Sequence, residues 1–263
     1  MSPDKSPLVL ISGASSGIGQ ALALRYYQAG YRLALIARRK QQMHEWAQSL
    51  PLAPERVFLY EGDVTDTDGL ISIAKTCTNQ HGLPDIVIAN AGISIGMDTA
   101  FREDIDVMAR VFATNNVGLA ATFHPFIEAM RVRGSGRLVG IASVAGIRGL
   151  PGHGAYCASK AAVISYCESL RGELCRSGVC VITIAPGFVD TPLTRKNRYP
   201  MPFLLSAEQF ADKAFNAIEA KRSFCVIPWQ MAITSRLMRF IPDSIWDRLF
   251  SRQVRKQRAN SDA

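Results

Sequence analysis

The chain has 263 residues, of which 48 % are hydrophobic and 20 % are charged, and its formal net charge is +8 at pH 7. This length fits one sizeable α/β domain, and the composition contains no homopolymeric or Gly/Ser-rich tract typical of a linker or a disordered segment. Residues 1–7 lack the zones of a signal peptide, and every apolar run is far shorter than the about 20 residues that span a bilayer.

Seven short runs rich in β-branched residues and Leu alternate with longer segments of helical period. Several runs are continuously apolar, as in strands that helices cover on both faces. The alternation predicts a doubly wound, seven-stranded parallel sheet with helices on both faces, whose ligands bind at the carboxyl ends of the strands. The predicted strands are 8–11, 32–36, 57–60, 85–89, 137–141, 179–184 and 224–227. The predicted helices include 17–29, 67–80, 113–131, 155–176 and 206–221.

The first predicted strand leads into a glycine-rich turn that opens the first helix. Its sequence is Ser12-Gly13-Ala14-Ser15-Ser16-Gly17-Ile18-Gly19, with the spacing G-x-x-x-G-x-G. Glycines permit backbone conformations and close approaches that a Cβ would block, and a helix N-terminus offers free N–H groups to a pyrophosphate. The turn therefore predicts a dinucleotide site, although a turn that only packs a helix on a strand has the same pattern.

The ends of the second and third predicted strands carry charged residues. Arg38 and Arg39 stand about 25 residues after the glycine turn, near where an acidic residue would bind a free ribose 2′-hydroxyl. Arginine there favours the 2′-phosphate of NADP over NAD, while a solvated pair that opens the next helix is the alternative. Asp63, followed by Val64, either accepts a hydrogen bond from the adenine amino group or caps the next helix.

A Ser, a Tyr and a Lys follow the fifth predicted strand. Tyr156 and Lys160 are four positions apart on a predicted helix, so their side chains leave the same face. The positive charge favours the phenolate and draws the Tyr156 pKa down from about 10, toward the range of a general acid or base. Ser143 lies just past the fifth predicted strand, where its hydroxyl can hydrogen-bond a reacting carbonyl oxygen.

Together these motifs resemble the short-chain dehydrogenase/reductase family in its compact form of about 250 residues, from residue 8 to about residue 228. The resemblance implies a Rossmann-type catalytic domain over 1–228, with 229–263 as a basic, helical C-terminal extension of the same domain. Ala89 replaces the first Asn of the family's frequent Asn-Asn-Ala-Gly motif, which leaves Asn90 intact. The matching motifs are Gly13, Gly17 and Gly19, Asp63-Val64, Ala89-Asn90-Ala91-Gly92, Asn115, Ser143, Tyr156-Cys157-Ala158-Ser159-Lys160 and Pro186-Gly187-Phe188-Val189-Asp190-Thr191.

The resemblance also implies roles for individual residues. Tyr156 would donate or accept the proton, Lys160 would lower its pKa and bind the nicotinamide ribose, and Ser143 would polarise the substrate oxygen. The Asn115 side chain would help hold a water of the proton relay. Asn116 is rejected because its spacing to Gly118 does not match the family's Asn-x-x-Gly. The implied cofactor-binding residues are Gly13, Ser15, Ser16, Gly17, Ile18, Gly19, Arg38, Arg39, Asp63, Val64, Asn90, Ala91, Gly92, Tyr156, Lys160, Pro186, Gly187, Val189 and Thr191.

The segment 192–205 follows the last cofactor motif and mixes basic with apolar residues. It is interpreted as a loop or short helix over the substrate, which favours a lipophilic carbonyl compound with an acidic group. A mobile surface lid with solvated charges is the alternative. Phe188, His153 and Met97 either reach the pocket or belong to ordinary packing or loop surface. The basic and apolar residues of the segment 192–205 are Leu193, Arg195, Lys196, Arg198, Tyr199, Met201, Phe203, Leu204 and Leu205.

The basic charge is concentrated at the C-terminus, where 229–258 holds seven Lys or Arg against two Asp. Pro242-Asp243-Ser244 is typical of a helix start. A basic amphipathic helix here predicts peripheral contact with an anionic membrane, and packing on its own domain or a sister subunit also fits. The apolar stripe is Ile245, Trp246, Leu249, Phe250 and Val254, with Arg248, Arg252, Arg255, Lys256 and Arg258 between and after it.

The six cysteines form no C-x-x-C pair and no zinc spacing, so we expect no metal site and reduced, cytoplasmic thiols. No motif supports nucleic-acid binding. The leading hypothesis is an NADP(H)-dependent enzyme acting on a small carbonyl or alcohol, and the family implies a homodimer or homotetramer. A 3-oxoacyl-carrier-protein reductase, a non-catalytic NADP sensor and a peripheral membrane or assembly protein are the alternatives.

Overall fold

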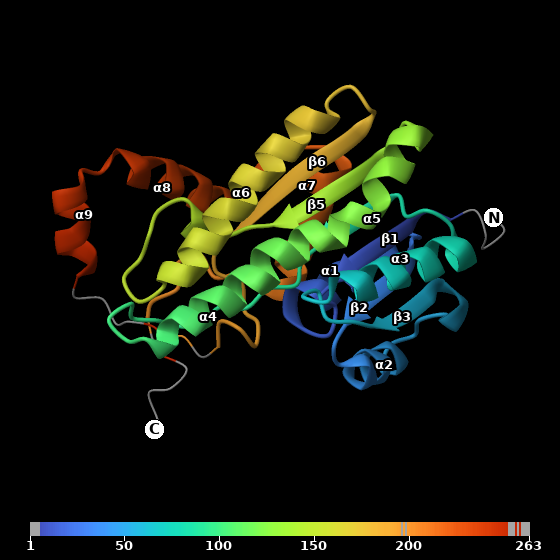
Figure 1. Cartoon of the computed structure of the whole chain (residues 1–263), viewed down its shortest axis with the longest axis horizontal. Coiled ribbons are helices and arrows are strands. Elements are labelled where there is room, and N and C mark those ends of the chain that lie inside the picture. The colour runs from blue at the N-terminus through green and yellow to red at the C-terminus, as the bar shows by residue number, and fades with distance from the viewer. Residues whose placement is uncertain (1–5, 196, 198, 252–255, 257, 259–263) are drawn as a thin grey trace.

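The computed structural model describes residues 6–195, 197, 199–251, 256 and 258. Within them, seven strands form one parallel sheet in the order β3-β2-β1-β4-β5-β6-β7, with helices on both faces (Figure 1). The predicted doubly wound sheet and its seven strands are confirmed. The strands are β1 Leu8–Ser12, β2 Arg32–Ala37, β3 Val57–Glu61, β4 Ile86–Ala89, β5 Gly136–Ile141, β6 Val179–Pro186 and β7 Phe224–Ile227.

The helices predicted from the sequence are present, and three further helices, α2, α4 and α8, accompany them. A π-helix at Ala113–Val117 joins α4 to α5, and all three share helical backbone angles at their junctions. Short 3₁₀ helices occupy Pro54–Arg56 and Val144–Gly146. The α-helices are α1 Gly17–Gln28, α2 Lys40–Gln48, α3 Thr67–His81, α4 Glu103–Phe112, α5 Gly118–Arg133, α6 Gly154–Leu174, α7 Ala207–Glu219, α8 Trp229–Phe240 and α9 Asp243–Phe250.

The central strands are continuously apolar because both of their faces are buried. Along β1, Leu8 and Leu10 belong to a core layer that α3, α5 and α6 cover. The alternate residues, Val9 and Ile11, belong to the opposite layer under α1 and α7. All four side chains are at most 1 % exposed. Successive side chains of a strand point to opposite faces, so one run of apolar residues supplies both layers.

The direction of strand addition reverses at β1, which pairs with β2 on one side and with β4 on the other. In such sheets the crossovers leave in opposite directions, and a crevice opens at the carboxyl ends of the strands. The register places Ser12 between Ile36 and Ala89, at the ends of the two neighbouring strands. The segments that follow these three residues therefore begin side by side.

Helices α8 and α9 lie beyond the carboxyl ends of the strands (Figure 1). The apolar stripe expected on the C-terminal helix is divided: Trp246 is 6 % exposed, whereas Ile245 and Leu249 are 51 % and 62 % exposed. Trp246 is held against the protein because its Nε1 donates to the Gly149 carbonyl at 3.1 Å. Val254 of this stripe lies outside the described residues. In the described part of the chain, no helix is both long enough and apolar enough to span a membrane.

All six cysteines are free. Cys77, Cys157 and Cys167 are buried, while Cys175 is exposed directly after the end of α6. Among the described residues, no group of three His, Cys, Asp or Glu is arranged to hold a metal ion.

Candidate active site

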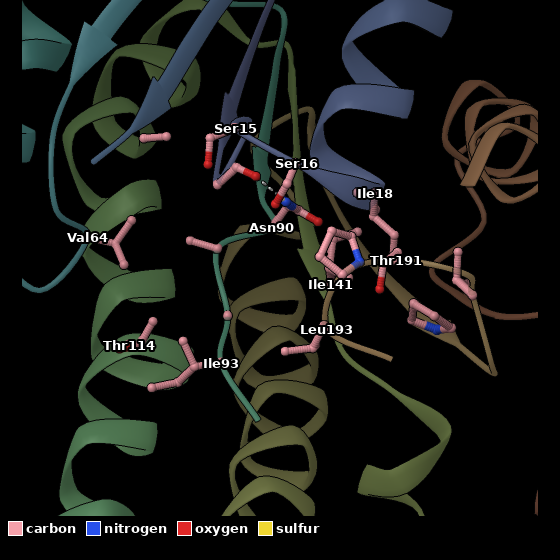
Figure 2. A pocket seen from close by; sticks show the side chains of 18 of the residues that line it. Ser15, Ser16, Ile18, Val64, Asn90, Ile93, Thr114, Ile141, Thr191 and Leu193 are labelled. Atoms are coloured by element: carbon pink, nitrogen blue, oxygen red, sulfur yellow. Dashed lines mark hydrogen bonds between the residues drawn. The ribbon is translucent and has the colours of Figure 1, made fainter. Parts of the chain in front are cut away.

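A cleft opens at the carboxyl ends of the strands and gathers residues from widely separated parts of the chain (Figure 2). All residues predicted to bind the cofactor or to act in catalysis line it, except Gly19 and Asn115. Those that line it are Gly13, Ser15, Ser16, Gly17, Ile18, Arg38, Arg39, Asp63, Val64, Asn90, Ala91, Gly92, Ser143, Tyr156, Lys160, Pro186, Gly187, Val189 and Thr191.

The glycine turn between β1 and α1 forms a cradle that side chains would close. Gly13 and Gly17 have φ angles of +69° and +56°, which L-residues rarely adopt. A Cβ on Gly13 would lie 2.6 Å from the Ala91 Cα, and a Cβ on Gly19 would collide with the Gly13 carbonyl oxygen. Gly19 therefore contributes by close packing beneath the cradle. Helix α1 begins without a side-chain cap and without an acidic residue in its first turn, so its N–H groups suit an anion.

Asn90 ties the cradle to the end of β4. Its Nδ2 donates to the carbonyl oxygens of Ser12 and Gly13 at 3.2 and 3.1 Å. Figure 2 shows the Asn90 side chain beside Ser15 and Ser16 of the glycine turn. Asn90 thus fixes the backbone that would surround a pyrophosphate.

The two arginines after β2 have different partners. Arg39 Nη2 donates to Ser15 Oγ at 3.1 Å, which places one guanidinium against the glycine turn. Arg38 Nη1 lies 3.7 Å from Asp63 Oδ2, and its side chain is 70 % exposed. Both line the cleft. Arg39 is the better placed of the two to meet a phosphate on the adenosine ribose.

Asp63 combines features of both hypotheses made for it. Its Oδ1 accepts from the backbone N and the Oγ1 of Thr65, each at 2.9 Å. Burial favours a higher pKa for this carboxyl group, but the Thr65 hydrogen bonds and Arg38 outweigh it and hold the pKa below its ordinary value. Asp66, and not Asp63, caps α3 by accepting from the Gly69 N at 3.0 Å. Asp63 therefore shapes the turn while it lines the cleft as a carboxylate.

Ser143 and Tyr156 face each other across the catalytic end of the cleft. Ser143 is 7 % exposed, and its Oγ accepts from the Ala145 N at 3.1 Å at the start of a 3₁₀ turn. Burial raises the pKa of the Tyr156 phenol to about 12, and a hydrogen bond with Ser143 works in the opposite direction. The phenol is therefore a protonated hydrogen-bond donor at neutral pH.

Lys160 lies one turn after Tyr156 on α6 and is 5 % exposed. Its Nζ donates to the Ile141 carbonyl oxygen at 2.8 Å and lies 5.9 Å from the centroid of the Tyr156 ring. Burial lowers the pKa of Lys160 to about 8. Burial is the largest influence on the Tyr156 pKa in this structure, and Lys160 is not among the groups that shift it, so the lowering expected from the pairing stays a prediction.

Asn115 is fully buried in the π-helix between α4 and α5. Its Oδ1 accepts from the Ile93 N at 2.8 Å, and its Nδ2 donates to the Ile93 O and to Ser159 Oγ at 3.0 and 2.9 Å. Both N–H groups of the amide are thus used by protein atoms. The side chain holds the segment after β4 against α6, and the role in holding a water stays a prediction. The neighbouring Asn116 donates to the Ser159 O at 2.8 Å.

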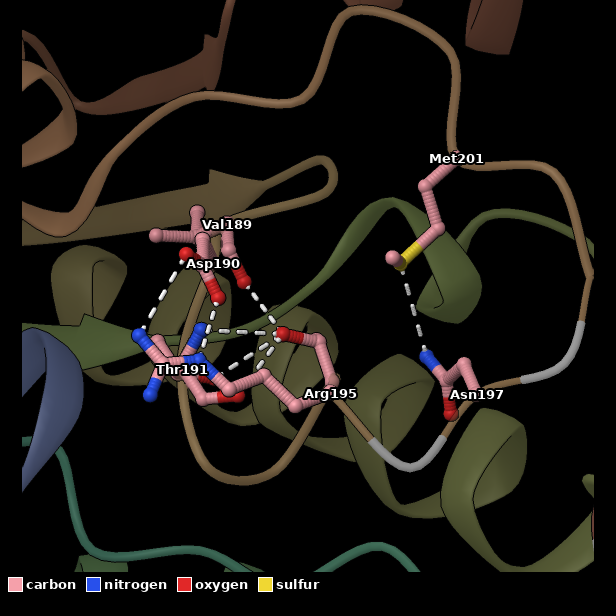
Figure 3. A network of polar contacts seen from close by, with 7 residues as sticks. Val189, Asp190, Thr191, Arg195, Asn197 and Met201 are labelled. Carbon is pink, nitrogen blue, oxygen red and sulfur yellow. Dashed lines mark hydrogen bonds and ion pairs between the residues drawn. The ribbon is translucent and has the colours of Figure 1, made fainter.

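The segment after β6 is tied down at both ends. Thr194 Oγ1 accepts from the Thr191 N at 3.0 Å and donates to the Val189 O at 2.5 Å (Figure 3). Arg195 Nε pairs with Asp190 Oδ1 at 2.8 Å. Leu205, near the other end, donates its N–H to the Phe188 O at 3.0 Å. Lys196 and Arg198, two of the charges expected here, lie outside the described residues.

Phe188, His153 and Met97 do not line the cleft. His153 Nε2 lies 3.3 Å from Tyr199 Oη, and the two rings meet edge to face at 5.6 Å. Phe188 lies 6.3 Å from the same Tyr199 ring, between centroids. Met97 is 6 % exposed, and its Sδ accepts from the Ala155 N. These side chains form packing beside the catalytic end.

Nine further residues line the cleft, of which Pro192, Leu193 and Thr194 belong to the segment 192–205 expected over the substrate, while the other six were not identified from the motifs. Each of these six lies within two residues of a predicted site residue, so extending each motif by one or two residues finds them. Thr114, for example, directly precedes Asn115 in the π-helix. The additional lining residues are Ala37, Gly62, Ile93, Thr114, Ile141, Ala142, Pro192, Leu193 and Thr194.

Comparison with known proteins agrees with this geometry. A family model described as short chain dehydrogenase matches residues 7–201. An uncharacterized oxidoreductase of Myxococcus xanthus is 37 % identical over 238 residues, which are 90 % of this chain and 94 % of that protein. A short-chain dehydrogenase from Streptomyces avermitilis superposes with a TM-score of 0.80 at 23 % identity, over 94 % of this chain and 96 % of that one.

A structure of a variant of actinorhodin polyketide ketoreductase with NADPH has a TM-score of 0.78 and 25 % identity, over 86 % of this chain and 97 % of that one. Sequence and fold therefore agree on one assignment. The chain belongs to the short-chain dehydrogenase/reductase family of NAD(P)-dependent oxidoreductases.

Proposed function

We propose that this protein is an NADP(H)-dependent oxidoreductase that transfers a hydride between the nicotinamide and a carbonyl or secondary alcohol carbon, with Tyr156 as general acid and base. The observation that carries the proposal is that Ser143, Tyr156 and Lys160 line the same cleft as the glycine turn. Residues able to move a proton and residues able to hold a dinucleotide thus occupy one continuous space.

The cleft suits a phosphorylated dinucleotide in two respects. Gly13 and Gly17 adopt φ angles that favour glycine in the turn that lines the cleft, and the first turn of α1 has no competing carboxylate. Arg39 adds a positive charge beside Ser15, where the 2′-phosphate of NADP would lie. The similarity to the ketoreductase that was solved with NADPH also supports NADP over NAD.

The proposed mechanism assigns one task to each side chain. Bound NADPH would supply the hydride, and NADP would accept it in the reverse direction. During reduction, Tyr156 donates its phenolic proton to the carbonyl oxygen, while the Ser143 hydroxyl donates a hydrogen bond to that oxygen. The phenolate that remains is stabilised by the Lys160 ammonium group one helical turn away. Asn115 is a positioning residue that fixes the segment beside the catalytic end.

The substrate end of the cleft favours an apolar carbonyl compound. Ile93, Ile141 and Leu193 line the cleft (Figure 2). Apolar walls with a few convergent polar groups are typical of small-molecule sites. A 3-oxoacyl group on an acidic carrier protein is the second candidate, favoured by the net charge of +8. The presence of all three proton-handling side chains in one cleft disfavours a non-catalytic sensor.

The cofactor assignment is tested by titrating the purified protein with NADPH and NADH. We expect tighter binding of NADPH, and Arg39→Ala weakens that binding about tenfold or more by removing a charge-assisted phosphate contact. Binding of NADH changes little, because NADH lacks the 2′-phosphate. Arg222→Ala is the matched control, since Arg222 is exposed and does not line the cleft. A preference for NADH in the unmodified protein would contradict the assignment.

The chemistry is tested by a carbonyl screen with Tyr156→Phe as the reference. Removing the phenolic proton lowers kcat by about two orders of magnitude or more, while NADPH affinity changes little. Free carbonyl compounds and 3-oxoacyl groups on carrier protein are compared side by side, which separates the two substrate candidates. Unchanged turnover by Tyr156→Phe would refute the role of Tyr156.

The proposal includes a cytoplasmic location and a homodimer or homotetramer. The free state of all six cysteines favours a reducing compartment. Assembly into dimers or tetramers is what the family commonly shows, and light scattering on the purified protein measures it.

A further inference from the structure

Helix α8 presents an apolar face to solvent. Trp229, Ile233, Leu237 and Phe240 are 66 %, 52 %, 61 % and 83 % exposed. Their spacing of four, four and three residues places them on one side of the helix. Met231 and Ser235 are buried on the side that packs against the protein. The exposed residues are thus a continuous stripe on the outer surface, which we call the α8 face.

Helix α9 extends this surface and arginines accompany it. Ile245 and Leu249 are 51 % and 62 % exposed. Arg236, Arg239 and Arg248 are also exposed, against two exposed acidic residues, Asp247 and Asp243, of which Asp243 pairs with Arg148 at 2.9 Å. An exposed apolar stripe with basic residues beside it is the pattern of helices that lie in a lipid interface.

The two helices are fixed to the loops of the active site. Arg148, between Ser143 and Tyr156 in the chain, donates to the carbonyl oxygens of Met238 and Ile241 and lies over the Trp246 ring at 4.3 Å. At the other end of α8, Met231 packs closely on Gly187, because a Cβ placed on Gly187 would lie 2.9 Å from the Met231 Cγ. The apolar stripe is therefore held outward by contacts on the inner side of both helices.

We propose that the α8 face, together with Ile245 and Leu249, docks on an anionic lipid membrane. The apolar side chains enter the boundary between headgroups and acyl chains, and the exposed arginines bind lipid phosphates. A symmetric pairing of this surface with a second copy would bring the arginines of two chains together, and this repulsion disfavours that occupant. A layer of lipid phosphates neutralises the same charges.

Docking places the carboxyl-end edge of the sheet beside the bilayer, because α8 and α9 lie beyond the ends of the strands (Figure 1). The cleft opens at that same edge. A lipophilic carbonyl substrate can then reach the cleft from the membrane. This last consequence rests on the proposed function, whereas docking itself requires no turnover.

The test is co-sedimentation of the full chain with phosphatidylcholine vesicles that contain about one third phosphatidylglycerol, and with pure phosphatidylcholine. We expect binding to the anionic vesicles and a partition coefficient about tenfold or more lower for the double variant Trp229→Ser, Phe240→Ser. Val132→Ser is the matched control, because Val132 is 82 % exposed near the end of α5 and away from the α8 face. The control binds like the unmodified protein.

A second variant tests the charge. Arg236→Gln, Arg239→Gln lowers binding to the anionic vesicles severalfold, and added salt does the same for the unmodified protein. Absence of binding by the unmodified protein, or equal binding by the double variant Trp229→Ser, Phe240→Ser, would overturn the proposal. The proposal would also be overturned if the unmodified protein did not bind vesicles and light scattering showed a lower mass for the double variant than for the unmodified protein. That result would assign the α8 face to contact with a second copy. Turnover of a water-soluble carbonyl without vesicles tests the enzyme separately.

Discussion

Lys160 holds its amino group in a nearly closed environment. Burial lowers its pKa from 10.5 to about 8, so the folded protein disfavours the ammonium form that the unfolded chain retains. Between these two values the unfolded chain binds more protons, and the free energy of unfolding therefore rises with pH. At neutral pH the buried Lys160 ammonium group therefore lowers the free energy of unfolding, and its value to the protein is its position beside Tyr156.

Lys160→Met should therefore raise the free energy of unfolding of the cofactor-free protein at pH 7. Relief of the buried charge contributes about 3 kcal/mol, and loss of the hydrogen bond to Ile141 costs about 1 kcal/mol, which leaves a gain of about 2 kcal/mol. Urea unfolding measures it. The gain shrinks as the pH rises from 8 toward 10.5, because the folded wild-type protein then carries neutral Lys160. Lys221→Met, at an exposed lysine, is the control and should show no such pH dependence.

At the scale of elements, one buried amide joins three segments. Asn115 links the π-helix to the segment after β4 through Ile93 and to α6 through Ser159. The i→i+5 pattern inserts an extra residue into the helix at this point, which is a common feature of functional sites. The part of α6 that carries Tyr156 is thus held in place by the π-helix between α4 and α5.

Asn115→Ala leaves the Ile93 N–H and C=O without their partner in a buried site. We expect a loss of about 3 kcal/mol of unfolding free energy and a lower kcat with little change in NADPH affinity. Asn116→Ala is the matched control, because Asn116 makes one hydrogen bond and its Oδ1 is buried without a partner. Its cost should be about 1 kcal/mol. Equal losses for the two variants, measured by urea unfolding, would contradict the positioning role.

The strands were the part of the fold most readily predicted from sequence. Runs such as 179–184 are apolar throughout because helices cover both faces of the strand, and this pattern can be recognised from the sequence alone. Helix α8 was not predicted, since its apolar residues point to solvent and hydrophobic period does not reveal which face is inside. The π-helix between α4 and α5 contains Asn115 and Asn116, residues of low helix propensity that tertiary hydrogen bonds to α6 hold in place.

The same division applies to the site. Gly13, Ser143 and Tyr156 could be identified because each residue type carries its chemistry at a fixed distance from a strand end. The hydrogen bonds of the Asn115 amide could not be predicted, because their partners come from segments 22 and 44 residues away. The Tyr156 pKa could not be predicted either, because its largest influence is burial of the phenol, which the spacing to Lys160 does not reveal.

On the scale of the whole molecule, the C-terminal residues that the structure describes return to the segment before α4. Arg258 Nε donates to the buried carboxylate of Asp104 at 2.7 Å, and the guanidinium lies 3.5 Å from the centroid of the Phe101 ring. Lys256 Nζ donates to Ser94 Oγ at 2.8 Å, just after Ile93 of the cleft. The last part of the chain therefore supports the edge of the site.

Arg258→Ala should destabilise the protein in a pH-dependent way. The hydrogen bond from Arg258, with one from the Asp98 N–H, holds the pKa of Asp104 below its ordinary value of 3.8. A depressed carboxyl pKa stabilises the fold above 3.8, and this contribution is lost as the pH falls through the folded value. Thermal unfolding should therefore separate variant from wild type at pH 7 and bring them closer below pH 3.8.

Arg102→Ala serves as the control for this ion pair. Arg102 and Asp106 form an exposed pair on α4, at 3.2 Å and with more than two thirds of each side chain accessible. Such pairs contribute little to stability. A loss for Arg258→Ala that is no larger than that for Arg102→Ala would show that the C-terminal return is not stabilising.

The exposed thiol of Cys175 follows the end of α6, whereas Tyr156 lies near the start of that helix. At 1.5 Å per residue the two are about 28 Å apart along the helix axis. The native sequence thus offers a thiol for attachment to a maleimide surface at the end of the molecule opposite the cleft. Protein immobilised through Cys175 would keep its cleft and the α8 face directed toward solution, so cofactor and lipid binding could be followed on one sensor.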